Sequence, residues 1–179
     1  MSIQHEKISG FVEVPGHDQS EPDLTVCIVT RNRRNDLEHA LQSVHDNASS
    51  LCVEVIVVDN HSTDGTAEII KEKYPQVQII HSPVNQGYAP AMNLALARAR
   101  GQYVLALSDD AELEPDSEEA LVRFMWSHPA AGLAGPRTID GRGQIVTTLH
   151  HPSLLLSIWT EIIPIKPWLR RTHLVRFAL

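Results

Sequence analysis

Two adjacent carboxylates, Asp109 and Asp110, follow an apolar run that ends at Leu107. Neighbouring carboxylates repel each other, and a divalent cation shared with phosphate oxygens removes that repulsion. Mg²⁺ and Mn²⁺ prefer oxygen ligands and often join one or two carboxylates to a phosphate. The other interpretation is an exposed loop whose acids favour the positive end of the next helix. The sequence by itself leaves both interpretations open.

A single carboxylate, Asp59, follows another apolar run. It could accept a hydrogen bond from a ribose hydroxyl or a base N–H, or it could close the strand with a turn. Asp64 and Gly65 are more typical of a turn and a helix cap. Gly87 either lets the backbone approach a ligand or supplies a positive φ. The sequence has no GxGxxG and no P-loop lysine motif, so it gives no support for those phosphate-binding loops.

Short apolar runs alternate with amphipathic segments between residues 24 and 127. The apolar runs predict buried strands at 24–29, 53–58, 77–80 and 103–107. The amphipathic segments predict helices at 35–47, with Asn35 as the cap, and at 66–74, 89–100 and 115–127. This order is typical of an α/β fold with a mostly parallel, doubly wound sheet and helices on both faces. Ligands bind at the carboxyl ends of such strands, so we expect the polar residues there to form a site.

Length and composition predict one main globular domain. The chain has 179 residues, of which 42% are hydrophobic, and this excludes a wholly disordered protein. We expect a flexible lead-in at 1–23, the main domain at 24–150 and an apolar, basic segment at 151–179. The last thirty residues carry a net charge of +3 and the rest −10. The acidic main part argues against nucleic acid as a partner.

The two cysteines form no disulfide framework, and the first thirty residues contain no apolar signal sequence. We therefore expect a cytoplasmic protein. Residues 154–179 interleave apolar and basic side chains, which suggests a peripheral contact with anionic lipid at the inner face of a membrane. The alternative is core or a contact with another subunit, and Pro152, Pro164 and Pro167 favour it because they break any long helix.

Three segments taken together resemble the family 2 glycosyltransferases, and most of all their rhamnosyltransferase-like members. The segments are TVCIVTRNRRNDLEHALQSV, VEVIVVDNHSTDGTAEII and NQGYAPAMNLALARARGQYVLALSDDAEL, within about residues 24–140. The resemblance implies a GT-A fold and an inverting transfer of a sugar from a nucleotide-diphosphate donor. It also implies a glycan or lipid-linked acceptor and a divalent metal, Mn²⁺ or Mg²⁺.

The resemblance also implies roles for single residues. Asp59 matches the family's base- or ribose-binding aspartate. The triplet Ser108–Asp110 matches the family's Asp-x-Asp metal motif with serine in the first place, so Asp110 is the expected metal ligand. Asp109 stands at the variable middle position beside the donor. The other donor-binding positions carried over are Thr30, Asn32, Asn85, Gly87 and Asn93.

The resemblance leaves the catalytic base unassigned. The family carries this base in an acidic motif of an acceptor-binding half, where it deprotonates the attacking hydroxyl. After Glu119 the sequence has only Asp140 and Glu161 as acids, and neither stands in such a motif. The segment Asp140-Gly-Arg-Gly instead predicts an exposed turn.

Three explanations of this missing base stay open. The chain is the donor-binding half of a longer enzyme, or transfer activity was lost, or another subunit supplies the base. The alternative function is a non-catalytic nucleotide-sugar-binding or regulatory module. A nucleotidyltransferase fits less well, because the basic segment 30–34 contains no glycine.

Overall fold

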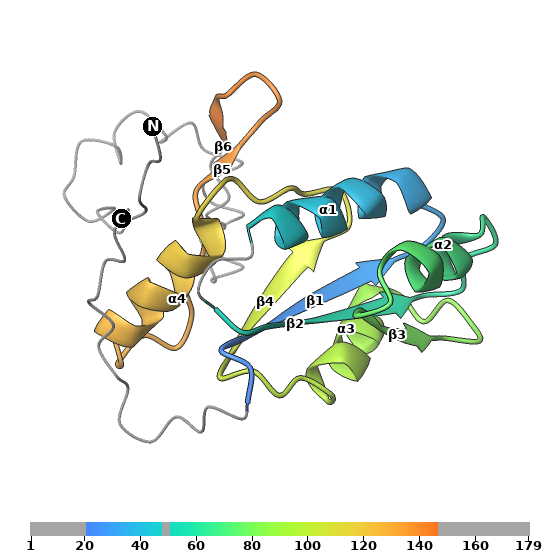
Figure 1. Ribbon diagram of the computed structural model, residues 1–179, viewed down its shortest axis with the longest axis horizontal. Coiled ribbons are helices and arrows are strands. Elements are labelled where there is room, and N and C mark those ends of the chain that lie inside the picture. The colour runs from blue at the N-terminus through green and yellow to red at the C-terminus, as the bar shows by residue number, and fades with distance from the viewer. Residues whose placement is uncertain (1–20, 48–50, 147–179) are drawn as a thin grey trace, which may run out of the picture. The chain divides into compact units, whose positions relative to one another are not determined.

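The computed structural model describes residues 21–47 and 51–146, whose main feature is a four-stranded parallel sheet with helices on both faces (Figure 1). The expected lead-in at 1–23 lies almost entirely outside the described residues, and the segment 151–179 lies wholly outside them. The strands are β1 (Leu24–Thr30), β2 (Val53–Asp59), β3 (Gln78–His81) and β4 (Tyr103–Ser108). The helices are α1 (Arg34–Asp46), α2 (Thr66–Lys73), α3 (Tyr88–Leu96) and α4 (Ser117–Ser127).

The strand order is β3-β2-β1-β4, and every neighbouring pair is parallel. The chain runs outward from β1 through β2 to β3, and then β4 pairs with the opposite side of β1. The strand order therefore reverses between β1 and β4, which is where ligands bind in sheets of this kind. Thr30 is level with Asp59, Asp59 is level with His81, and Ser108 is level with Val29. The predicted site residues at the strand ends therefore lie together, at the carboxyl ends of the strands.

All seven residues of β1 are buried, because helices cover both faces of the sheet. Val26 and Ile28 pack in one core cluster with α1, α2 and α4, whereas Cys27 and Val29 pack in another with α3. The predicted doubly wound α/β arrangement is therefore confirmed. Burial, with a smaller contribution from the charge of Glu54, raises the pKa of the Cys27 thiol to about 11, so this thiol is not a nucleophile.

Tertiary contacts shift two of the predicted helix boundaries. Asn35 is not the cap of the first helix, which begins one residue earlier at Arg34. The backbone N–H of Arg34 donates to Asp64 Oδ2 at 3.2 Å, so a neighbouring loop supplies the acceptor. The third helix ends at Leu96 rather than at residue 100. Beyond it, Arg100 is held by Glu54 of β2, through both its backbone N–H and its guanidinium.

Gly101 marks a close approach between the start of β4 and β1. Its N–H donates to Thr25 Oγ1 at 2.8 Å, and a Cβ atom on Gly101 would lie 2.4 Å from the Thr25 backbone nitrogen. That separation is too short for any side chain. The glycine predicted to stop the helix therefore also allows β4 to pair with β1.

The chain divides into two compact units, Met1–Ala134 and Gly135–Leu179. The described part of the second unit is a hairpin of β5 (Thr138–Ile139) and β6 (Ile145–Val146). Asp140 Oδ1 accepts the backbone N–H groups of Arg142 and Gln144, so the predicted turn is confirmed. The expected domain boundaries remain predictions. No described helix is long and apolar enough to cross a lipid bilayer.

Glu118 is an unusual residue of α4, because its side chain is fully buried. Neither of its carboxylate oxygens has a hydrogen-bond partner among the described residues. Desolvation disfavours the charged form, and burial raises the pKa of this carboxyl from 4.5 to about 7. The sequence suggested only that acids favour the start of this helix, and it gave no sign of burial.

We predict that Glu118→Gln stabilises the protein above neutral pH. Between pH 4.5 and about 7 the native state keeps the proton that the unfolded state releases, so the wild type loses stability as the pH rises. The loss is complete above the folded pKa and reaches about 3 kcal/mol at most. Denaturant unfolding should show a gain for Glu118→Gln at pH 8 and almost none at pH 4.5.

The matched control is Glu119→Gln, because the neighbouring Glu119 pairs with Arg123 on the partly exposed side of α4. An exposed pair contributes about 1 kcal/mol or less, so this variant should not gain stability at pH 8. An equal gain for Glu118→Gln at both pH values would show that the pKa of Glu118 is not raised in the folded protein.

Candidate functional site

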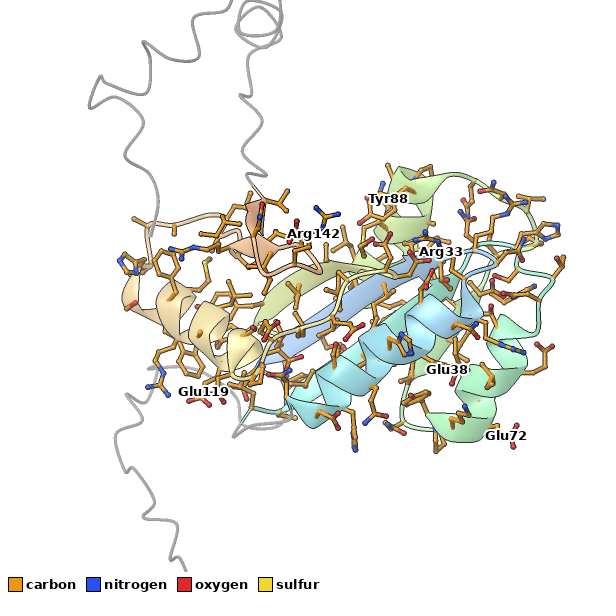
Figure 2. The ribbon with its side chains drawn as sticks, turned by 90° about the horizontal axis from the view of Figure 1, so that it is seen from above. Arg33, Glu38, Glu72, Tyr88, Glu119 and Arg142 are labelled. Carbon is orange, nitrogen blue, oxygen red and sulfur yellow. The ribbon has the colours of Figure 1, made fainter. Side chains whose placement is uncertain are left out.

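The candidate site lies at the carboxyl ends of the strands, beside the reversal of strand order. Arg33 reaches this end just before α1, and Tyr88 begins α3 on the opposite face of the sheet (Figure 2). Four connecting segments meet here, one after each strand of the sheet. Backbone hydrogen bonds link them, since Asn60 N–H donates to Thr30 O and Ser82 N–H donates to Asp59 O, both at 2.9 Å.

Arg33 connects the segments that follow β1 and β4. Its Nη1 atom donates to Asp110 Oδ2 at 2.6 Å and to Asp109 Oδ1 at 3.4 Å. The Ser108 hydroxyl donates to the other oxygen of Asp110 at 2.5 Å. Sequence reasoning did not select Arg33, although the basic segment 30–34 and the acid pair were both predicted at this edge. The ion pair therefore joins the segment after β1 to the segment after β4.

The two carboxylates differ in how accessible they are. The Asp109 side chain is 11% exposed, whereas that of Asp110 is 51% exposed. The hydrogen bond from Ser108, followed by that from Arg33, lowers the pKa of Asp110 below its usual range, so this carboxylate is ionised at neutral pH. Asp110 is therefore the more available of the two for an incoming cation.

Asp59 is buried at the end of β2, and both its oxygens are engaged. Oδ1 accepts the Ser62 backbone N–H at 2.9 Å, and Oδ2 lies 2.9 Å from His81 Nδ1. The Ser62 bond closes a turn after β2, and it reaches three residues along the chain instead of the two of an Asx turn. His81 is largely exposed, and sequence reasoning did not select it. Only the pairing of β2 with β3, which sets His81 level with Asp59, identifies it as a partner.

Asn60 holds the segment after β2 against the segment after β3. Its side chain is buried, and Nδ2 donates to Asn85 Oδ1 at 2.9 Å and to the Gly87 carbonyl at 3.2 Å. Its Oδ1 accepts the Gln86 backbone N–H at 3.0 Å. Asn85 and Gly87 are thus brought together by a residue that sequence reasoning did not select.

Gly87 has a φ of +82°, and no atom lies within 4 Å of where its Cβ would be. Glycine is therefore favoured here by the positive φ, and not by a lack of space for a side chain. Asn93 lies exposed on α3, and its side chain makes no hydrogen bond within the described parts of the chain. The structure brings Asn85 and Gly87 into the hydrogen-bonded network but leaves Asn93 outside it.

Asn32 joins the segments after β1 and β2. Its backbone has a φ of +54°, which places its N–H 3.0 Å from Ser62 Oγ and its Oδ1 2.7 Å from the Thr63 N–H. Thr30, by contrast, is buried, and its hydroxyl has no hydrogen-bond partner among the described residues. A pocket of about 310 Å³ opens beside Asn32, lined by Asn32–Asp36 and Asp64.

Comparison with known proteins decides the family. Residues 25–177 match the family described as Glycosyl transferase family 2. The chain belongs to this family. It is 29% identical to N-acetylglucosaminyl-diphospho-decaprenol L-rhamnosyltransferase of Mycobacterium tuberculosis over 161 residues, which are 81% of this chain and 52% of that protein. The chain therefore spans about half the length of this relative.

Solved structures confirm the expected GT-A fold of this family 2 glycosyltransferase chain. S. aureus TarS in complex with UDP matches with a TM-score of 0.56 and 24% identity, covering 60% of this chain and 33% of that one. The mannosyltransferase PcManGT from Pyrobaculum calidifontis, in complex with GDP-Man and Mn²⁺, matches with a TM-score of 0.54 and 28% identity. That match covers 59% of this chain and 32% of the mannosyltransferase.

The chemistry of Asp109 and Asp110 fits a divalent cation that shares its coordination with phosphates. The described residues contain no group of three or more histidine, cysteine, aspartate or glutamate side chains that could hold a metal ion. Mg²⁺ commonly binds through one or two carboxylates and completes its shell with phosphate oxygens and water. These two carboxylates could supply only part of such a shell, and phosphate oxygens or water would have to complete it.

We predict that Asn60→Ala destabilises the protein by about 1–2 kcal/mol, because it removes three hydrogen bonds that join the segment after β2 to the segment after β3. The matched control is Asn93→Ala, which removes an exposed amide from α3 and should cost almost nothing. Denaturant unfolding measures both variants. An equal cost for the two would show that the Asn60 bonds contribute little to stability.

Proposed function

We propose that this chain binds a nucleotide-diphospho-sugar and contributes to the inverting transfer of its sugar to a glycan or a lipid-linked acceptor. Family membership supports the reaction class. The observation that carries the proposal is the meeting of Asp109, Asp110 and Arg33 where the strand order reverses. Carboxylates that can hold a cation and a guanidinium that can bind phosphate are what a diphosphate group requires.

Each side of the site has a separate proposed role. Asp110, with Asp109 beside it, would hold Mn²⁺ or Mg²⁺ together with the donor's diphosphate. A cation bound there would supply charge neutralisation for the leaving nucleotide diphosphate. Asp59 binds the base or ribose, and the remaining donor contacts come from Thr30, Asn32, Asn85, Gly87 and Asn93.

No residue of the described site is assigned to the acceptor or to the catalytic base. Asp140 is engaged in its own turn, and Glu161 lies outside the described residues. The base is therefore left unassigned, and a non-catalytic nucleotide-sugar-binding module remains the second candidate. The role of residues 154–179, as a peripheral membrane contact or a subunit contact, also remains a prediction.

We predict that UDP or TDP binds this chain in a metal-dependent way. Phosphates held through a shared cation lose that contact when the cation is removed. Calorimetry with Mn²⁺ should detect binding, and excess EDTA should abolish most of it. Equal affinity in both conditions, or no binding in either, would contradict the proposed donor site.

We predict that Asp110→Asn removes the metal-dependent part of this binding. Loss of a ligand should weaken Mn²⁺-supported nucleotide binding on the order of 10- to 100-fold, as loss of an outer-shell partner already can. The control Asp116→Asn removes the same charge from an exposed residue later in the same segment, and it should leave affinity unchanged. If both variants lose nucleotide affinity equally, the loss comes from the net negative charge of this segment and not from a metal ligand at Asp110.

We predict that Asp59→Ala weakens the binding of free nucleoside as well as nucleotide. Loss of a buried acceptor costs about 1–3 kcal/mol, or roughly 5- to 150-fold in affinity. Asp59→Asn is the informative companion, because its amide oxygen can still accept the Ser62 N–H while its charge is gone. Calorimetry should show that both variants lose nucleoside affinity. If Asp59→Asn kept full affinity for nucleoside, the role of the Asp59 carboxylate would be only to close the turn after β2.

A further inference from the structure

One guanidinium atom stands in contact with both carboxylates of the proposed metal site. Arg33 Nη1 lies 2.6 Å from Asp110 Oδ2 and 3.4 Å from Asp109 Oδ1. A cation held by these two carboxylates would be attracted by the same negative charge that Arg33 now neutralises. Arg33 and a divalent cation therefore compete for the same negative charge.

We propose that Arg33 is a built-in competitor of the divalent cation at Asp109 and Asp110, and that it transfers to the donor's diphosphate when the cation binds. This inference rests on the proposed function. It goes further by naming a residue that couples metal binding to nucleotide binding.

Arg33 is free to make this transfer. Its side chain is 45% exposed, and its Nε atom lies 3.5 Å from Oδ2 of a third carboxylate, Asp36 of α1, which could hold it during the exchange. Exposed ion pairs are weak, so leaving Asp110 has a small cost. A guanidinium also matches the geometry of a phosphate group with two parallel hydrogen bonds.

The charges explain why the exchange couples the two ligands. Asp36, Asp109 and Asp110 together with Arg33 carry two negative charges, and an added divalent cation would cancel them. Arg33 and the cation would then repel each other at close range. A diphosphate relieves this repulsion, because its oxygens attract both the cation and Arg33. Metal and nucleotide should therefore each raise the affinity of the site for the other, by the same factor.

The test measures Mn²⁺ alone, without nucleotide, by electron paramagnetic resonance of the free ion. Arg33→Met keeps most of the side-chain length and removes the charge, so it should bind Mn²⁺ about 3- to 10-fold more tightly than the wild type. In saturating Mn²⁺ the same variant should bind UDP or TDP about 10-fold more weakly, because a phosphate contact is lost.

The matched control is Arg34→Met. Arg34 is the next residue, is exposed, and forms no ion pair within the described ranges. It should change Mn²⁺ affinity less than about twofold, because an exposed charge that is not in contact with the carboxylates is screened. Thermal unfolding of both variants confirms that they are folded.

The outcomes separate this inference from the proposed function. No gain in Mn²⁺ affinity for Arg33→Met, or an equal gain for Arg34→Met, would overturn the competitor role even if the wild type binds nucleotide with Mn²⁺. A wild type that binds nucleotide equally well in EDTA would overturn the metal-dependent donor site itself.

Discussion

The strand β1 is the constraint on which the rest of the structure depends. It lies between β2 and β4, is buried along its whole length, and has its two faces covered by different helices. The parallel register on both sides of β1 fixes how far each neighbouring strand extends. The segments that leave the strands must therefore begin at the same edge, and the reversal of strand order there is where sheets of this kind bind ligands.

Hydrogen bonds from polar side chains, one of them the buried Asn60, give this edge its shape. Asn60 ties the segment after β2 to the segment after β3, and Asn32 ties the segment after β1 to the segment after β2. Asp64 accepts from the first residues of both α1 and α2. These bonds connect the segments that follow β1, β2 and β3 to one another.

Charge is distributed unequally within this frame. Arg33 is the cation in contact with Asp109 and Asp110 among the described residues, and Ser108 stabilises the ionised form of Asp110 from the other side. Asp59 is instead satisfied by a backbone N–H and by His81. One end of the site thus resembles a cation and phosphate region, whereas the other resembles a hydrogen-bonding region for a less charged group.

The sequence alone determined the alternation of strands and helices, the carboxylates at the strand ends and the resemblance to family 2 glycosyltransferases. These features depend on local hydrophobic period and on short motifs, which can be read along the chain. Only the tertiary structure decided that Arg33 meets Asp109 and Asp110, that Asn60 organises Asn85 and Gly87, and that Glu118 is buried. Each of these depends on contacts between residues far apart in the chain, or on burial by other elements, and no local pattern records which side chains meet.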